Sequence, residues 1–113
     1  MNAIFVELPP FQRYREHYIS DANLRVLQAL LLQRPDAGDV IPETGGLRKL
    51  RFGDPRRGKG KRGGLRVIYY WWVAGDQIWL FTLYGKDEAD DLTVQQRRTL
   101  AHLLLRERQL RAI

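Results

Sequence analysis

Two neighbouring apolar segments constrain the fold of this chain more than any other feature of the sequence. Residues 65–73 (LRVIYYWWV) and 77–84 (QIWLFTLY) are rich in β-branched and aromatic residues. Ala74-Gly75-Asp76 between them has the composition of a tight turn, so the two segments predict an antiparallel β-hairpin. We therefore expect a domain organised around a mainly antiparallel sheet.

The chain before the hairpin predicts two more strands and two helices, because short apolar runs alternate there with helical leucine spacings. Pro9 and Pro10 end the first strand, and Pro10 suits the first turn of a helix. The second helix can begin at an N-cap on Ser20 or Asp21, and Pro35 ends it. Its predicted buried face holds Leu24, Leu27, Leu30 and Leu31. The predicted strands cover residues 3–8 and 47–52, and the first helix covers residues 10–18.

The chain after the hairpin predicts a third helix, which extends to about residue 110. Thr93 and Gln96 have the spacing of a capping box at its start. Its inward face is expected to carry Leu100, Leu103, Leu104 and Leu110. The predicted order is β-α-α-β-β-β-α, which indicates one α+β domain over residues 1–113 with the helices packed on one face of a small twisted sheet.

The positive charge of the chain is concentrated in residues 47–66 (LRKLRFGDPRRGKGKRGGLR). Nine basic residues and one acidic residue give this stretch a formal charge of +8, whereas the whole chain of 113 residues carries only +6. The remainder is therefore slightly acidic. A localised charge of this size favours a polyanionic partner, of which nucleic acid is the commonest, with an anionic membrane surface or an acidic protein segment as alternatives.

Alternation of side chains along each predicted strand gathers part of this charge on one face of the sheet. We expect the helices to cover the face that carries Leu50, Phe52, Phe81 and Leu83, provided that no β-bulge shifts a strand. The free face then carries basic and hydroxyl-bearing side chains. These are Lys49, Arg51, Arg66, Thr82, Tyr84 and, just past the strand end, Lys86. Cations and aromatic rings on one face suit the phosphates and bases of single-stranded RNA.

Composition argues against several classes of protein. The chain has no cysteine, and His17 and His102 fall on separate predicted helices, so we expect neither a metal site nor another cofactor. No apolar run approaches the roughly 18 residues that span a bilayer, and the N-terminus lacks a signal-peptide pattern. We therefore expect a cytoplasmic protein without membrane contact. The glycine-rich loop 58–64 matches neither the Walker A nor the dinucleotide-binding pattern.

Each of these features also has a plainer structural interpretation. A basic loop can simply be solvated, and the aromatic run 69–72 suits a sheet core better than a base-stacking platform. The acidic run 87–91 can complement the N-terminal end of the third helix. The size of the basic charge, set against an acidic remainder, nevertheless favours nucleic-acid contact over inert charge.

Four segments, taken together with their order and spacing, resemble the HigB branch of the RelE/ParE toxin superfamily. They are residues 45–51 (GGLRKLR), 58–64 (GKGKRGG), 66–70 (RVIYY) and 83–86 (LYGK), followed by an acidic stretch and Leu92-Thr93. The resemblance implies the toxin of a bacterial type II toxin–antitoxin module. Such a toxin cleaves mRNA in the ribosomal A site, inhibits translation, and is neutralised by a small helix-turn-helix antitoxin of the HigA type.

The resemblance also implies site residues, because RelE-type enzymes use basic side chains on the middle strands, one near the last strand, and an aromatic close by. Carried over by position, the candidate catalytic residues are Lys49, Arg51, Arg66, Tyr84 and Lys86. Independently of the resemblance, the basic charge of the glycine-rich loop and its flank gives the candidate RNA or ribosome contacts, which are Arg48, Arg56, Arg57, Lys59, Lys61 and Arg62. The chain departs from the pattern in lacking an evident C-terminal catalytic tyrosine, which leaves the general acid and base unassigned.

The leading hypothesis is therefore a metal-independent endoribonuclease, in which the 2′-hydroxyl of the RNA attacks the adjacent phosphate and leaves a 2′,3′-cyclic phosphate. Arg66 would stabilise the developing charge, and Lys49 or Lys86 would act as the base. Two alternatives stay open. One is a ParE-like toxin that shares the fold but poisons a protein such as gyrase, and the other is a passive RNA-binding domain with salt-sensitive affinity.

Overall fold

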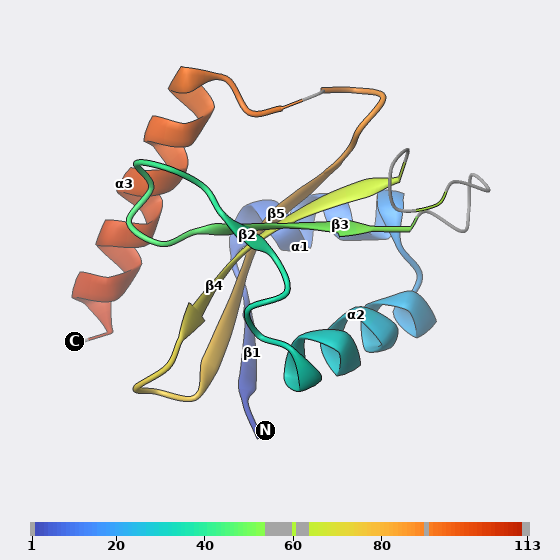
Figure 1. The fold of residues 1–113 in the computed structure, drawn as a ribbon, viewed down its shortest axis with the longest axis horizontal. Helices are drawn as coiled ribbons and strands as arrows, with labels where there is room; N and C mark the ends of the chain where they lie inside the picture. The colour runs from blue at the N-terminus through green and yellow to red at the C-terminus, as the bar shows by residue number, and fades with distance from the viewer. Residues whose placement is uncertain (1, 54–59, 61–63, 90, 112–113) are drawn as a thin grey trace.

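The computed structural model describes residues 2–53, 60, 64–89 and 91–111, and it contains a five-stranded mixed sheet with three helices (Figure 1). The strands are β1 (Ile4–Glu7), β2 (Asp39–Val40), β3 (Arg48–Phe52), β4 (Leu65–Trp72) and β5 (Gln77–Gly85), and the helices are α1 (Pro9–Tyr18), α2 (Asp21–Gln33) and α3 (Val94–Leu110). The sheet order is β1-β5-β4-β3-β2. Only β1 and β5 run parallel, so the predicted α+β class and mainly antiparallel sheet are confirmed.

The predicted hairpin is formed by β4 and β5, and a β-bulge interrupts its register. Ile68 pairs with Thr82 and Tyr69 pairs with Leu80, which leaves Phe81 as an extra residue in β5. The bulge places Phe81 on the same side of the sheet as Thr82 and Tyr84, so the prediction that Phe81 and Leu83 share a face is wrong. Leu83 lies on the opposite side, as predicted.

Helices α1 and α2 cover one face of the sheet. The hydroxyl of Ser20 accepts a hydrogen bond from the backbone N–H of Asn23, which confirms the predicted cap of α2. Buried residues from both helices pack against alternate residues of the strands. This first core cluster includes Phe11, Tyr18, Leu24, Leu27 and Leu31 from the helices and Leu50, Phe52, Leu65, Val67, Tyr69, Ile78, Leu80 and Leu83 from the strands.

Helix α3 packs on the opposite face, so the expectation that all helices share one face is wrong. Figure 1 shows α3 and α2 on different sides of the sheet. The predicted capping box of Thr93 and Gln96 is present at its start. The second core cluster joins Leu100 and Leu104 of α3 to strand residues such as Ile68, Trp79 and Phe81. The bulge explains the composition of this cluster, because it reverses the alternation of β5 and so places Trp79 and Phe81 on the face covered by α3.

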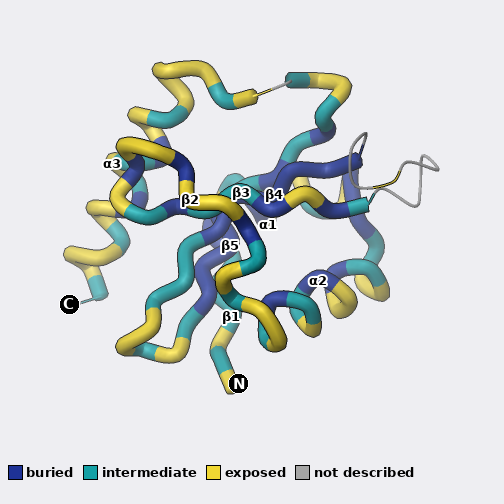
Figure 2. Tube along the Cα trace, in the orientation of Figure 1, coloured by how far each residue is buried: buried dark blue, intermediate teal, exposed yellow. Residues whose placement is uncertain are grey.

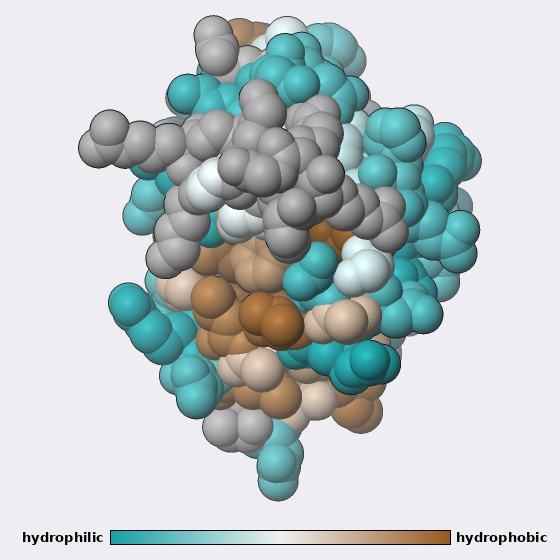
Figure 3. Space-filling view, turned by 90° about the vertical axis from the view of Figure 1, so that its right-hand side faces the viewer, coloured by the Kyte–Doolittle hydropathy of each residue, from teal (hydrophilic) through white to brown (hydrophobic). Residues whose placement is uncertain are grey.

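The inward face of α3 is shorter than predicted. Leu100 and Leu104 are buried and Leu103 packs against their cluster, but Leu110 is 68% exposed. Buried residues concentrate on the central strands β4 and β5, while the outer surface of α3 is largely exposed (Figure 2). On the side that forms the right-hand edge of Figure 1, apolar side chains reach the surface between hydrophilic ones (Figure 3). None of the described helices is both long and apolar enough to cross a membrane.

A buried tyrosine ties the loop after α2 to the centre of the sheet. Tyr69 of β4 is fully buried, and its hydroxyl donates to the carbonyl oxygen of Pro35 at 2.7 Å and accepts from the N–H of Gly38 at 2.9 Å. Burial is the main reason that the pKa of Tyr69 lies above its ordinary value. A side chain at position 38 would collide with the Tyr69 ring, since a Cβ there would lie 2.8 Å from it.

Replacement of this hydroxyl tests whether the loop depends on it. Tyr69→Phe leaves the buried Gly38 N–H and Pro35 carbonyl without that partner, so we expect a loss of about 1–3 kcal/mol in the free energy of unfolding, measured by urea denaturation. Tyr14→Phe is the matched control, because Tyr14 is exposed on α1 and its loss of a hydroxyl is expected to change stability by less than about 0.5 kcal/mol. Equal stabilities of the two variants would contradict this role for Tyr69.

Candidate nucleic-acid cleft

The register of β3, β4 and β5 brings five of the predicted side chains into two adjacent rows on one face of the sheet. The first row runs across the three strands as Arg51, Arg66 and Tyr84, since Arg51 pairs with Arg66 and Arg66 pairs with Tyr84. The second row runs as Lys49, Ile68 and Thr82. Residues directly opposite on antiparallel strands have Cβ atoms about 5 Å apart. We call this set of Lys49, Arg51, Arg66, Thr82 and Tyr84 the cleft floor.

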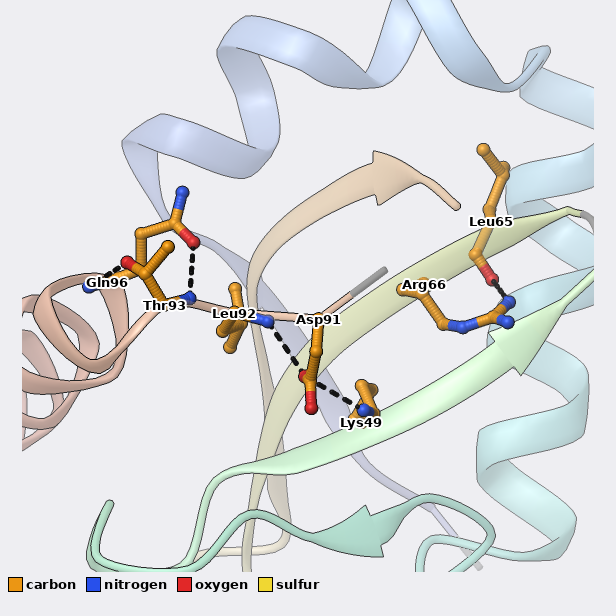
Figure 4. A network of polar contacts seen from close by, with 7 residues as sticks. All are labelled: Lys49, Leu65, Arg66, Asp91, Leu92, Thr93 and Gln96. Carbon is orange, nitrogen blue, oxygen red and sulfur yellow. Dashed lines mark hydrogen bonds and ion pairs between the residues drawn. The ribbon is translucent and has the colours of Figure 1, made fainter. Parts of the chain in front are cut away.

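Two arginines directly opposite one another are unfavourable for the sheet by themselves, because like charges at this separation repel. Arg66 is also only 3% exposed, which adds a desolvation cost to its charge. Its guanidinium donates to the carbonyl oxygen of Leu65 at 3.1 Å, which helps to fix its orientation (Figure 4). Arg51 is exposed. The two arginines therefore differ: Arg66 is a buried cation oriented by the Leu65 carbonyl, and Arg51 is an accessible cation at the opposite position of the neighbouring strand.

A carboxylate from the segment before α3 enters the cleft and pairs with Lys49. The Nζ of Lys49 lies 3.1 Å from Oδ1 of Asp91, and the same oxygen accepts a hydrogen bond from the N–H of Leu92 at 2.7 Å (Figure 4). The Leu92 N–H is the main reason that the pKa of Asp91 lies below its ordinary value of 3.8, with Lys49 and Arg97 contributing. Asp91 is therefore charged at neutral pH. Its contribution to stability is present above about pH 4 and is lost as the pH falls through the lowered pKa.

Tyr84 supplies a hydrogen-bond donor to the cleft. Burial is the main reason that its pKa is raised above 10.0; the charge of Asp91 raises it further, and Arg66 lowers it. The phenol is therefore protonated at neutral pH. Its hydroxyl oxygen is shielded from solvent and makes no hydrogen bond to any residue that the structure describes. A shielded hydroxyl without a hydrogen-bond partner lowers the stability of a folded protein, so we expect the Tyr84 hydroxyl to have a functional role.

The remaining predicted residues are placed differently. Arg48 lies on the opposite parity to the cleft floor, and its guanidinium donates to the carbonyl oxygens of Asp36 and Gly38, so it holds the loop after α2. The N–H of Lys86 donates to the carbonyl of Gly64, which continues the β4–β5 pairing and keeps Lys86 in alternation with Tyr84. Five predicted contacts lie outside the described residues: Arg56, Arg57, Lys59, Lys61 and Arg62.

Two acidic residues near the cleft were not predicted to have specific roles. Asp91 was expected only to complement the helix end, but it pairs with Lys49, which is 42 positions away in the chain. Glu88 accepts hydrogen bonds from the Tyr18 hydroxyl and the Gly85 N–H. No local signal could have found these contacts, because both depend on packing. His17 and His102 are exposed, and among the described residues no cluster of three or more His, Asp or Glu side chains could hold a metal ion.

Comparison with known proteins supports the fold. No family model matches the chain. The solved structure of the E. coli toxin RelE, a mutant with two arginines replaced by alanine in its free state, is similar over 80% of this chain and 90% of that chain. The TM-score is 0.53 and the sequence identity is 10%. The chain therefore has a RelE-like fold.

The ion pair of Lys49 and Asp91 predicts competition between Asp91 and an added polyanion. Asp91→Asn removes the internal competitor for Lys49, so we expect single-stranded RNA to bind about two- to fivefold more tightly, in keeping with the modest strength of exposed ion pairs. Fluorescence anisotropy at low salt with a labelled 2′-O-methyl RNA measures the affinity. Asp76→Asn, in the exposed hairpin turn, removes the same charge far from Lys49 and is the control. Equal gains in the two variants would show that only net charge matters.

Proposed function

We propose that this chain is the toxin of a type II toxin–antitoxin module and cleaves mRNA on the ribosome. The observation that carries the proposal is that Arg66 and Arg51 occupy directly opposite positions on β4 and β3, so that two guanidinium groups from neighbouring strands can bind one phosphate. The RelE-like fold supports the same function, since the similar structure is that of a toxin. The resemblance of the sequence motifs points further to the HigB branch.

The proposed reaction consumes no water and no other co-reactant, because the nucleophile is a hydroxyl of the RNA itself. The 2′-oxygen of one nucleotide attacks the adjacent phosphorus, the bond from phosphorus to the 5′-oxygen breaks, and the products are a 2′,3′-cyclic phosphate and a 5′-hydroxyl end. A base accepts the proton of the 2′-hydroxyl, and an acid supplies a proton to the departing 5′-oxygen. Negative charge builds on the phosphate oxygens, which the cations of the cleft floor stabilise.

The geometry favours particular roles for these cations. Arg66 is buried and held by the Leu65 carbonyl, so its guanidinium is positioned before the substrate arrives and needs little reorganisation. Arg51 is the accessible partner that completes the phosphate site. Lys49 or Lys86 is the candidate base, and Lys49 becomes available when a phosphate displaces it from Asp91. Tyr84 is protonated at neutral pH and can donate to a phosphate or a leaving oxygen.

The proposed partners follow from the same function. The mRNA is bound in the A site of the small ribosomal subunit, and the basic residues of the glycine-rich loop contact RNA there. A helix-turn-helix antitoxin of the HigA type neutralises the toxin, and both act in the cytoplasm. This assignment explains why so much positive charge is placed in one part of a chain whose remainder is slightly acidic.

Substitution of the buried arginine tests the proposal. Arg66→Ala removes a positioned cation, so we expect cleavage of mRNA on translating ribosomes to slow by about a hundredfold or more. Arg66→Lys keeps the charge but loses the bidentate fork and is expected to retain intermediate activity. Cleavage is measured by mapping 3′ ends and detecting cyclic phosphates. Arg25→Ala, at an exposed position of α2, is the control.

Folding of each variant is verified by its thermal unfolding transition, because Arg66 is buried. Cleavage by folded Arg66→Ala at the wild-type rate would refute the role of this residue. A wild-type chain that binds RNA but produces no cyclic-phosphate ends would be a passive binder. A chain that cleaves no RNA but inhibits gyrase supercoiling would instead be a ParE-like toxin.

A further inference from the structure

A second recess opens beside the cleft floor, between α1, the end of β5 and α3. Strand β4 pairs with β5 along one edge up to Gly85, whereas on the other edge β1 pairs with β5 only as far as Leu80. Within the described part of the chain, no strand pairs with the last residues of β5 on that second edge. The recess has a volume of about 670 Å³, in the size range of small-molecule binding pockets. Thr82 and Tyr84 line it and also belong to the cleft floor. A nucleic-acid strand on the cleft can therefore reach it.

The chemistry of the recess differs from that of the cleft. Its polar lining consists of hydroxyl, amide and carboxylate groups, and none of the described residues that line it is lysine or arginine. The main polar contributors are Tyr14, Tyr18, Tyr84, Glu88, Gln95 and Thr99. A carboxylate repels phosphate, whereas tyrosine rings and amide groups are suited to the planar faces and polar edges of a nucleobase. The cations of the cleft floor therefore suit the phosphate, and the polar but cation-free lining of the described recess suits the base.

Glu88 is held so that part of its carboxylate is available to a ligand. Its Oε1 atom accepts the hydrogen bonds from the Tyr18 hydroxyl and from the Gly85 N–H at 3.3 Å. Both hydrogen bonds that Glu88 makes with described residues end on this oxygen, which leaves Oε2 as an oriented acceptor in the recess. An exocyclic amino group of adenine, cytosine or guanine can donate to it. Uracil has no exocyclic amino group, and its one donor on the Watson–Crick edge, N3–H, lies between two carbonyl oxygens that the carboxylate repels.

Helix α3 and Tyr84 complete the set of polar groups. Among the described residues, the side-chain nitrogen of Gln95 makes one long hydrogen bond of 3.5 Å, to the Thr99 hydroxyl, so its amide can turn toward a ligand. The shielded hydroxyl of Tyr84 lacks a partner among the described residues, and a ribose or base atom in the recess would supply one.

We propose that this recess binds one nucleobase of the RNA strand whose phosphate lies on the cleft floor, and that Glu88 selects bases with an exocyclic amino group. The inference rests on the proposed function, and it adds a base-reading site beside the phosphate site. Glu88 acts here as a specificity residue and takes no part in bond breaking.

Binding of short RNAs tests the base site apart from catalysis. The probes are labelled 2′-O-methyl heptamers, which lack the attacking hydroxyl, with uridine at every position or with a single central adenosine, cytidine or guanosine. We expect the intact wild-type chain to bind the three substituted heptamers about tenfold more tightly than the all-uridine heptamer, the effect of one hydrogen bond to a charged group. In Glu88→Gln, which keeps an acceptor for Tyr18 and Gly85, the preference is expected to fall below about twofold.

Two further variants make the result specific. Asp87→Asn removes the same charge from the neighbouring, exposed position, which does not line the recess, and is expected to keep the full preference. Gln95→Ala, at an exposed helical position, is expected to weaken the substituted heptamers by about threefold without changing the all-uridine heptamer. Equal binding of all four heptamers by the wild type, or an unchanged preference in Glu88→Gln, would overturn the base site. So would the absence of any binding.

Mapping of mRNA cleavage on ribosomes separates this inference from the proposed function. If the wild-type chain cleaves mRNA and the bases at the cut sites are the same for Glu88→Gln, the base site is wrong and the proposed function stands. If the heptamers show the expected preference but no mRNA is cleaved, the base site stands and the proposed function fails.

Discussion

The position of β4 between β3 and β5 is the constraint on which the rest of the structure depends. Arg66 meets Arg51 on one side and Tyr84 on the other only because β4 pairs in register with both neighbours. The register is held by the opposite face of β4, where Leu65, Val67 and Tyr69 are fully buried in the first core cluster. A slip by one residue would remove these side chains from the first core cluster and place Arg66 in it. Burial of apolar side chains on one face of β4 therefore determines which charged side chains lie next to one another on the other face.

Helix α3 connects that electrostatic arrangement to the second core cluster. Leu100 and Leu104 seat the helix against Trp79 and Phe81, and the capping box fixes where it begins. The segment just before this start then brings Asp91 to Lys49. The position of α3 thus determines whether Asp91 can neutralise Lys49. It also sets one wall of the recess beside Tyr84. Any partner that shifts α3 would change the charge of the cleft and the shape of the recess together.

Much of the candidate site could be predicted because it depends on short-range alternation within strands. Arg66 and Thr82 lie on the predicted face, since β4 is regular and the last residues of β5 follow the bulge. The bulge itself was missed, because β5 is apolar on both parities around Phe81 and either arrangement buries the same residue types. Arg48 belongs to the same basic stretch, but its parity differs from that of the cleft floor, and its guanidinium donates to the loop carbonyls of Asp36 and Gly38.

The sequence by itself determined the order of the elements except for the short strand β2, which it did not predict, together with the hairpin, the helix caps and the alternation that gathers the cations of the cleft floor on one face. These features depend on neighbours within a few residues, whose chemistry is visible in the chain. Only the tertiary structure decided that α3 covers the face opposite to α1 and α2, that Asp91 meets Lys49, and that Glu88 is held by Tyr18 across 70 positions. Such contacts depend on how separate apolar faces are buried against one another, and no local pattern encodes that choice.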